Sequence, residues 1–98
     1  MALLVEYSLK DGMADDQVSA LETFVAGLKQ LGDPGYHYSS FATDDPTRFI
    51  ALFEFDDEGA KQRFLASDAF QAYRDGAGAR FTGPPSTTAL TPVASTRG

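Results

Sequence analysis

The sequence predicts an α+β fold built around a four-stranded antiparallel sheet, and three observations lead to it. Segments with a two-residue apolar period alternate with segments of helical period, in the order strand, helix, strand, strand, helix, strand. No repeat, low-complexity tract or linker interrupts that order, and 98 residues are enough for one domain. The order is the ferredoxin-like βαββαβ plan. We therefore expect one domain over residues 1–94 and a C-terminal tail over residues 95–98.

The first strand and the first helix show two different periods. Residues 3–9 place apolar side chains at every second position, as a strand with one buried face does. The segment DGMADD follows, and we expect Asp15 or Asp16 to cap a helix. The apolar positions of that helix recur at steps of three and four residues: Val18, Leu21, Phe24, Val25, Leu28 and Leu31. Gly32 and Pro34-Gly35 are expected to end it.

The second and third strands are expected to form a hairpin. Residues 36–41 (YHYSSF) are rich in aromatic and hydroxyl side chains, which suits a strand. The segment TDDPT at 43–47 is a turn signal, and RFIALFEF at 48–55 is the third strand. Right-handed connections then place the first and third strands at the centre of the sheet.

A second helix and a last strand complete the fold. Asp56-Asp57 can cap this helix. Its apolar pattern is interrupted at Ser67-Asp68 and continues at Phe70 and Tyr73. Ser67 is expected to restart a helical turn there. A glycine- and proline-rich loop leads to STTALTPV at 86–93, the predicted fourth strand, with Pro92 near its end.

Composition excludes several classes of protein. The net charge of −6 and the pI near 4.4 oppose binding to nucleic acid, because the eight basic residues are scattered along the chain. Without cysteine there is no disulfide or thiolate metal site. No apolar run approaches the roughly 18 residues of a membrane span. The lack of a charged-then-apolar leader argues against secretion, so we expect a cytoplasmic protein.

The apolar character of RFIALFEF on both faces predicts a homodimer. Two crossover helices cover one face of the sheet, and the opposite face carries Ile50, Leu52 and Leu4. Burying a large aliphatic side chain is worth about 1.5–3 kcal/mol, and a contiguous exposed patch marks an interaction site. Two sheets packed face to face about a two-fold axis form an eight-stranded barrel with the helices outside. The alternative is a monomer in which a loop or the C-terminal tail covers this face.

Four stretches carry a family resemblance: LLVEYSLKDG in the first strand, DPGYHYSS at the second, Glu54-Phe55 closing the third, and FLASDAFQAYRDG in the second helix. Over residues 2–94 the chain resembles the antibiotic biosynthesis monooxygenase-like group of dimeric α/β-barrel proteins. The resemblance implies oxidation of an electron-rich planar phenol, quinol or polyketide-like compound by molecular oxygen, often with no metal or flavin.

The second helix keeps part of the pattern of that group and departs from it elsewhere. Ser67, Ala72 and Tyr73 match, whereas histidines are common where this chain has Phe64 and Ala69. A proline is usual where Asp68 stands, and tryptophan is frequent at the position of Phe55.

Such chemistry requires an apolar pocket and a polar group that takes a phenolic or enolic proton. His37, the only histidine, is the candidate base, unless it simply faces solvent or the dimer seam. Tyr7 and Tyr73 are further catalytic candidates, because a central strand and the second helix can face each other. The candidate substrate-binding residues are Tyr36, Tyr38, Phe53, Phe64 and Glu54. Tyr36 and Tyr38 share one face of their strand and His37 lies on the other.

The carboxylates predict no metal or cofactor site. Glu6 and Glu54 are expected at the dimer seam, where Arg48 or Ser8 could pair with them. Left unpaired there, a carboxylate has a raised pKa and could act as a base. The acidic clusters at 44–45 and 56–58 are turn and cap residues without the spacing of a calcium loop, and no histidine pair exists for zinc or iron.

Four functions remain open at this point. The first is a cofactor-independent monooxygenase, which requires an apolar pocket with His37 or a tyrosine in its wall. The second is a non-catalytic ligand-binding or stress-related dimer, which predicts an interior filled by side chains and no titrating group with a perturbed pKa. Haem degradation is weaker, because His37 alone could ligate the iron. Isomerisation or cyclisation of a polyketide-like compound would use the same pocket and base without oxygen.

Overall fold

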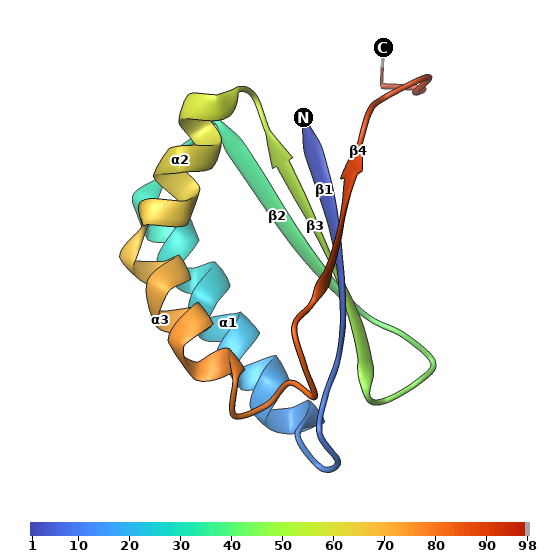
Figure 1. The fold of residues 1–98 in the computed structure, drawn as a ribbon. Helices are drawn as coiled ribbons and strands as arrows, with labels where there is room; N and C mark the ends of the chain where they lie inside the picture. The colour runs from blue at the N-terminus through green and yellow to red at the C-terminus, as the bar shows by residue number, and fades with distance from the viewer. Residues whose placement is uncertain (98) are drawn as a thin grey trace.

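A computed structural model describes residues 1–97, and its sheet has the expected connectivity. The elements within these residues are β1 (Ala2–Ser8), α1 (Ala14–Leu31), β2 (Tyr36–Ala42), β3 (Arg48–Phe55), α2 (Glu58–Ala66), α3 (Asp68–Ala77) and β4 (Ser86–Leu90). The strands lie antiparallel in the order β2-β3-β1-β4, so β1 and β3 are central, as predicted. All three of these helices lie on one face of the sheet (Figure 1). No helix within residues 1–97 combines the length and hydropathy that a bilayer span needs.

The two-residue pleat of the central strands separates two apolar faces. The register pairs Tyr7 with Phe49 on the face toward the helices, where these side chains are 5% and 4% exposed. On the opposite face, called the helix-free face below, the register pairs Leu4 with Leu52, and Ile50 lies beside them. RFIALFEF thus presents one apolar face to the helices and a second to the side of the sheet that they leave open.

The predicted second helix is divided in two at Ser67. This residue is extended, and it is both the C-cap of α2 and the N-cap of α3. Its Oγ accepts a hydrogen bond from the Phe70 amide at 3.2 Å and donates one to the Phe64 carbonyl at 2.7 Å. The break directs α3 against α1, and a Cβ on Gly27 would come within 2.9 Å of the Ala69 Cβ. Glycine is therefore required at position 27 for the observed approach of the two helices.

Two predicted boundaries were wrong. Helix α1 begins at Ala14 with Met13 as the N-cap residue, and no side chain caps it. Asp15 and Asp16 lie in its first turn, where their charge favours the positive end of the helix dipole. Strand β4 ends at Leu90 rather than at residue 93, because its pairing with β1 stops at Ala2. The part of the predicted tail at 95–97 is exposed, and residue 98 lies outside the described residues.

The buried side of α1 differs from the predicted apolar stripe. Its buried residues are Gln17, Leu21, Phe24 and Leu28. Val18 and Leu31, both predicted in the stripe, are 42% and 56% exposed. The stripe is therefore rotated toward a polar residue, Gln17, whose side chain has no exposed surface.

Aromatic rings fill much of the space between the sheet and the helices. Phe64 in α2 is 1% exposed, and its ring meets the rings of Phe24, Phe55 and Tyr36 at centroid distances of 5.9, 5.6 and 5.2 Å. These three rings come from α1, β3 and β2, so Phe64 joins the helical layer to two strands.

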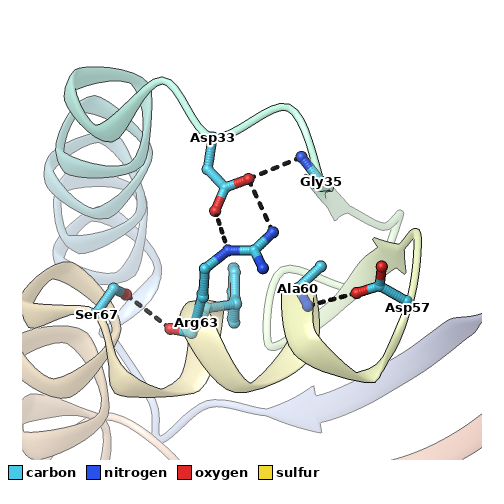
Figure 2. Close-up of polar contacts among 7 residues, drawn as sticks. Asp33, Gly35, Asp57, Ala60, Arg63 and Ser67 are labelled. Atoms are coloured by element: carbon cyan, nitrogen blue, oxygen red, sulfur yellow. Dashed lines mark hydrogen bonds and ion pairs between the residues drawn. The ribbon is translucent and has the colours of Figure 1, made fainter.

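An ion pair fastens the loop after α1 to helix α2 (Figure 2). Arg63 Nε donates to Asp33 Oδ2 at 2.7 Å, and the Gly35 amide donates to Asp33 Oδ1 at 2.8 Å. The hydrogen bond from Arg63, followed by that from Gly35, holds the pKa of Asp33 below its usual range. Asp57 begins α2 as predicted, since its Oδ1 accepts from the Ala60 amide at 2.8 Å.

We expect the substitution Ser67→Ala to lower the free energy of unfolding by about 1 kcal/mol, because it removes the N-cap of α3. Urea denaturation followed by far-UV circular dichroism measures the change. Ser19→Ala is the matched control, since Ser19 is exposed in α1 and alanine is a good helix former. Equal losses in the two variants would contradict the capping role of Ser67.

Candidate functional site

A cavity of about 670 Å³ lies between the sheet and the helices. We call it the sheet–helix cavity, and its main aromatic lining residues are Tyr7, Tyr38, Phe53, Phe70, Tyr73 and Phe81. Its walls come from all four strands, from α2 and α3, from Lys10 after β1 and from the segment between α3 and β4. The volume falls within the range of small-molecule sites, about 300–1,000 Å³. The space is therefore large enough for a planar aromatic compound.

A second hollow, of about 820 Å³, lies in the groove between α1 and α3. Polar side chains such as Thr23, Gln30 and Asp68 contribute to its walls, and no strand does. A small-molecule site needs walls that surround most of the ligand. The sheet–helix cavity, which has walls on both layers, is the better candidate.

The structure brings four of the predicted site residues together. Tyr7 and Tyr73, predicted as catalytic, both line the sheet–helix cavity, and so do Tyr38 and Phe53, predicted as substrate-binding. Tyr38 stands edge-on to Phe53, with centroids 5.1 Å apart. The tyrosine wall required by the monooxygenase hypothesis is present, and the interior is not filled by side chains.

The other four predicted residues lie outside the cavity. Tyr36 and Phe64 pack on each other in the adjoining core. His37 and Glu54 are opposite each other in the β2–β3 register, on the helix-free face. His37 is exposed, and its Nε2 lies 3.2 Å from Ser39 Oγ. The pleat of β2 turns Tyr36 inward and His37 outward, which is the position expected of a histidine at solvent or at a dimer seam.

Cations lie beside both carboxylates of the helix-free face. Arg48 Nη2 is 3.7 Å from Glu6 Oε2, which confirms one of the two partners predicted for this pair of carboxylates. Arg97 Nη1 is 3.8 Å from Glu54 Oε2. Since Arg97 is highly exposed, this second contact contributes little to stability.

A buried hydrogen-bond network lies behind the tyrosine wall. Gln17 Nε2 donates to the hydroxyls of Tyr7 and Tyr73, both at 2.8 Å. Gln17 Oε1 accepts from Arg80 Nε at 2.7 Å, and Arg80 Nη1 donates to the Gly76 carbonyl at 2.9 Å. The guanidinium of Arg80 also lies 5.5 Å from the centre of the Tyr73 ring. The network joins α1, β1, α3 and the segment after α3.

Gln17 and Arg80 were missed in the sequence, although a signal for Gln17 existed. Position 17 precedes Leu21 by four residues and Phe24 by seven, so it belongs to the same helix face. A search restricted to apolar residues does not detect it. Arg80 lies in a loop whose sequence has no period, and no comparable signal marks it.

Burial controls the ionisation of the tyrosines in the cavity wall. Burial, and next the proximity of Tyr73, raises the pKa of the Tyr7 hydroxyl above its ordinary value. Burial likewise raises the pKa of Tyr38. Both phenols are therefore neutral at physiological pH and act as hydrogen-bond donors or acceptors, not as bases.

The remaining ionisable groups of the cavity wall are cationic. Lys10 and Arg74 line it, and no carboxylate or imidazole does among residues 1–97. The wall thus provides apolar surface, phenolic hydroxyls and positive charge. Within the described chain, no three His, Cys, Asp or Glu side chains come close enough together to hold a metal ion.

Comparison with protein families gives one match over most of the chain. The family model described as antibiotic biosynthesis monooxygenase matches residues 1–76. A comparison with curated protein sequences found no match.

Solved structures with this fold come from several bacteria. A protein from Nitrosomonas europaea superposes with a TM-score of 0.82 at 16% identity, over 95% of this chain and 98% of its own. A protein from Caulobacter crescentus has a TM-score of 0.83 at 17% identity, over 95% and 89%. A protein from Pseudomonas aeruginosa has a TM-score of 0.80 at 19% identity, over 95% and 93%. The first two are named after antibiotic biosynthesis monooxygenases, and at these identities the similarity shows the fold alone.

We expect the free energy of unfolding to fall as the pH rises above about 10, where tyrosines in the unfolded chain lose their protons. Native Tyr38 keeps its proton there because burial raises its pKa, so the release of protons favours unfolding. The substitution Tyr38→Phe should reduce this fall by about 1.4 kcal/mol per pH unit, the contribution of one proton. Urea denaturation at a series of alkaline pH values measures it.

Tyr36→Phe is the control for this measurement, because burial raises the pKa of Tyr36 less than that of Tyr38. The slope of stability against pH should change less in this variant. An unchanged slope in Tyr38→Phe would show that the Tyr38 hydroxyl titrates normally in the folded protein.

Proposed function

This chain belongs to the antibiotic biosynthesis monooxygenase family, and from that membership we propose that it is a cofactor-independent monooxygenase. The proposed substrate is a planar phenol or quinol, or a polyketide-like compound, and the oxidant is molecular oxygen. The observation that carries this proposal is the sheet–helix cavity, with Tyr7 and Tyr73 in its wall.

The cavity suits a flat, hydroxylated guest. Phe53, Phe70 and Phe81 provide apolar ring surfaces that replace water around the substrate. Tyr7 and Tyr73 are the proposed catalytic residues, since their hydroxyls can hold the oxygen atom of the substrate. Tyr38 and Phe53, which line the cavity from the same sheet as Tyr7, are the proposed binding residues.

The proposed reaction inserts one oxygen atom into the substrate. The substrate first releases its phenolic or enolic proton to solvent, and the resulting anion passes one electron to O₂. The substrate radical and the superoxide then combine to a peroxide. After protonation, this hydroperoxide eliminates water and leaves a carbonyl group, so one oxygen atom stays in the product and the other leaves in water. The substrate is oxidised by O₂ alone, and the side chains of the cavity bind, orient and desolvate it.

A second candidate function is non-catalytic binding of the same kind of compound. The observation that favours it is the absence of a carboxylate or imidazole among the residues of the described chain that line the cavity. Isomerisation or cyclisation would use the same cavity without consuming oxygen. Oxygen uptake separates the monooxygenase from the binding protein.

A homodimer through the helix-free faces is the proposed assembly. Phe41 and Leu90, 52% and 38% exposed, extend the apolar surface around Ile50 and Leu52 across the outer strands of the sheet. This apolar surface supports association, because a second copy of the same sheet can pack against it about a two-fold axis. The sheet–helix cavity of each subunit then remains on the far side of its sheet.

We expect the protein to consume oxygen in the presence of a naphthoquinol faster than the buffer control does. The substitution Tyr73→Phe should lower kcat/KM by about 100-fold, the usual cost of losing one hydrogen-bond donor to a developing oxyanion. An oxygen electrode measures the rates. His37→Ala should keep the wild-type rate, because His37 lies on the helix-free face. Equal rates for Tyr73→Phe and wild type would remove the tyrosine pair from the mechanism.

The proposed dimer predicts a particle of twice the 10.5 kDa chain mass in light scattering at micromolar concentration. The substitution Leu52→Arg should shift the mass toward a single chain, because it places a charge in the centre of the helix-free face. Leu31→Arg is the control, since Leu31 is exposed at the end of α1. A single-chain mass for the wild-type protein would contradict the dimer.

A further inference from the structure

We infer that Gln17 is a positioning residue that makes the Tyr7–Tyr73 pair a hydrogen-bond donor, so that the sheet–helix cavity selects the ionised form of a phenol or enol. This inference rests on the proposed substrate cavity, and it holds whether or not the bound compound reacts with oxygen. It names the ionisation state of the guest, which the proposed function leaves open.

Arg80 determines which way the Gln17 amide points. A guanidinium carries only donors, so the atom of Gln17 that meets Arg80 Nε at 2.7 Å must be the amide oxygen. The amide nitrogen then faces the two hydroxyls, at 2.8 Å from each. A reversed amide would set two donors against each other at Arg80. Because Gln17 has no exposed surface, water cannot relieve such a conflict.

The orientation of the Gln17 amide decides whether the hydroxyls of Tyr7 and Tyr73 have a proton left to donate to a guest. Each of the two amide hydrogens is donated to one tyrosine, so Tyr7 and Tyr73 act as acceptors toward Gln17. Each hydroxyl keeps its own proton. At most one of these protons can be donated within the pair, and no other acceptor within residues 1–97 is hydrogen-bonded to either hydroxyl. At least one phenolic proton therefore has no acceptor among these residues and is available to a guest whose oxygen atom reaches the pair.

The charges around the pair favour an anionic guest as well. Lys10 before α1 and Arg74 on α3 line the cavity, and Arg80 lies behind the Tyr73 ring at 5.5 Å. The other titratable groups of the wall are Tyr7 on β1, Tyr38 on β2 and Tyr73 itself. A neutral donor and nearby cations both stabilise an oxyanion relative to its protonated form. The site thus lowers the pKa of a phenol or enol that it binds.

A purely structural role of Gln17 makes a different prediction. Gln17 also ties α1 to β1 and α3, so its loss would lower stability under either role. The substitution Gln17→Glu separates the two roles, because it keeps the shape and the contact with Arg80. The carboxylate introduced by this substitution would accept hydrogen bonds from the hydroxyls of Tyr7 and Tyr73. Their protons would then no longer be available to a guest.

The test uses alizarin, a planar dihydroxyanthraquinone whose visible absorption changes when a phenolic proton is lost. Titration of the bound dye against pH gives its pKa in each protein, and circular dichroism verifies folding. In the wild-type protein we expect the pKa of bound alizarin to lie about one pH unit below that of the free dye. In Gln17→Glu it should rise by at least about one pH unit relative to the wild-type complex.

Gln30→Glu is the matched control, since it adds the same charge to an exposed position of the same helix. Its bound dye should titrate as in the wild-type protein. If Gln17→Glu does not fold, Gln17→Met removes the donor without adding charge, and the lowering of the dye pKa should be at least halved. Equal dye pKa values in folded wild-type protein and Gln17 variant, or no saturable binding by the wild type, would overturn the inference.

The two proposals fail in distinguishable ways. If the pKa of the bound dye is lowered but the protein consumes no oxygen in the presence of quinols, the monooxygenase proposal is contradicted and the role of Gln17 is supported. Oxygen uptake with the same dye pKa in Gln17→Glu and wild type contradicts the role of Gln17 alone.

Discussion

The pleat of the two central strands is the constraint on which the other features of this protein depend. Side chains alternate between the two faces of a strand, so a slip of one residue would exchange the faces completely. The observed register keeps Tyr7 under the helices and Leu4 and Leu52 on the helix-free face. The same short strands thereby form one wall of a ligand cavity and, on the other side, an apolar surface suited to association.

The break at Ser67 gives the cavity its second wall. Ser67 ends α2 and begins α3, and the new direction brings α3 close to α1 at Gly27 and Ala69. Tyr73 in α3 then reaches Gln17 in α1, which already contacts Tyr7 in the sheet. A polar residue in this core is costly unless every group is satisfied. Here the hydrogen bonds of Gln17 connect the helical layer to the sheet.

The charges of the cavity contrast with those of the whole chain. The net charge is −6, yet the ionisable side chains of the cavity wall are the basic Lys10 and Arg74 and three tyrosines. Charges on the outer surface are screened over about 10 Å at ordinary salt concentrations, whereas partly buried groups are screened much less. Lys10 and Arg74 are themselves exposed and screened by salt, so their effect on a bound compound comes from their place in the cavity wall, which no carboxylate of the described chain shares.

Sequence periodicity was sufficient to predict the order of the elements, the central position of the first and third strands, the separation of His37 from Tyr36 and Tyr38, and the facing of Tyr7 and Tyr73. The separation of the faces follows from spacings of a few residues along the chain. The central strands and the facing of Tyr7 and Tyr73 follow from the order of the elements and the right-handed connections between them. The open cavity and the pairing of Gln17 with Arg80 could not be predicted in this way. The two residues are 63 positions apart, and their contact depends on how α1 packs against α3 and the loop that follows it. Local spacing carries no information on such a contact, because it arises from the packing of complete elements in three dimensions.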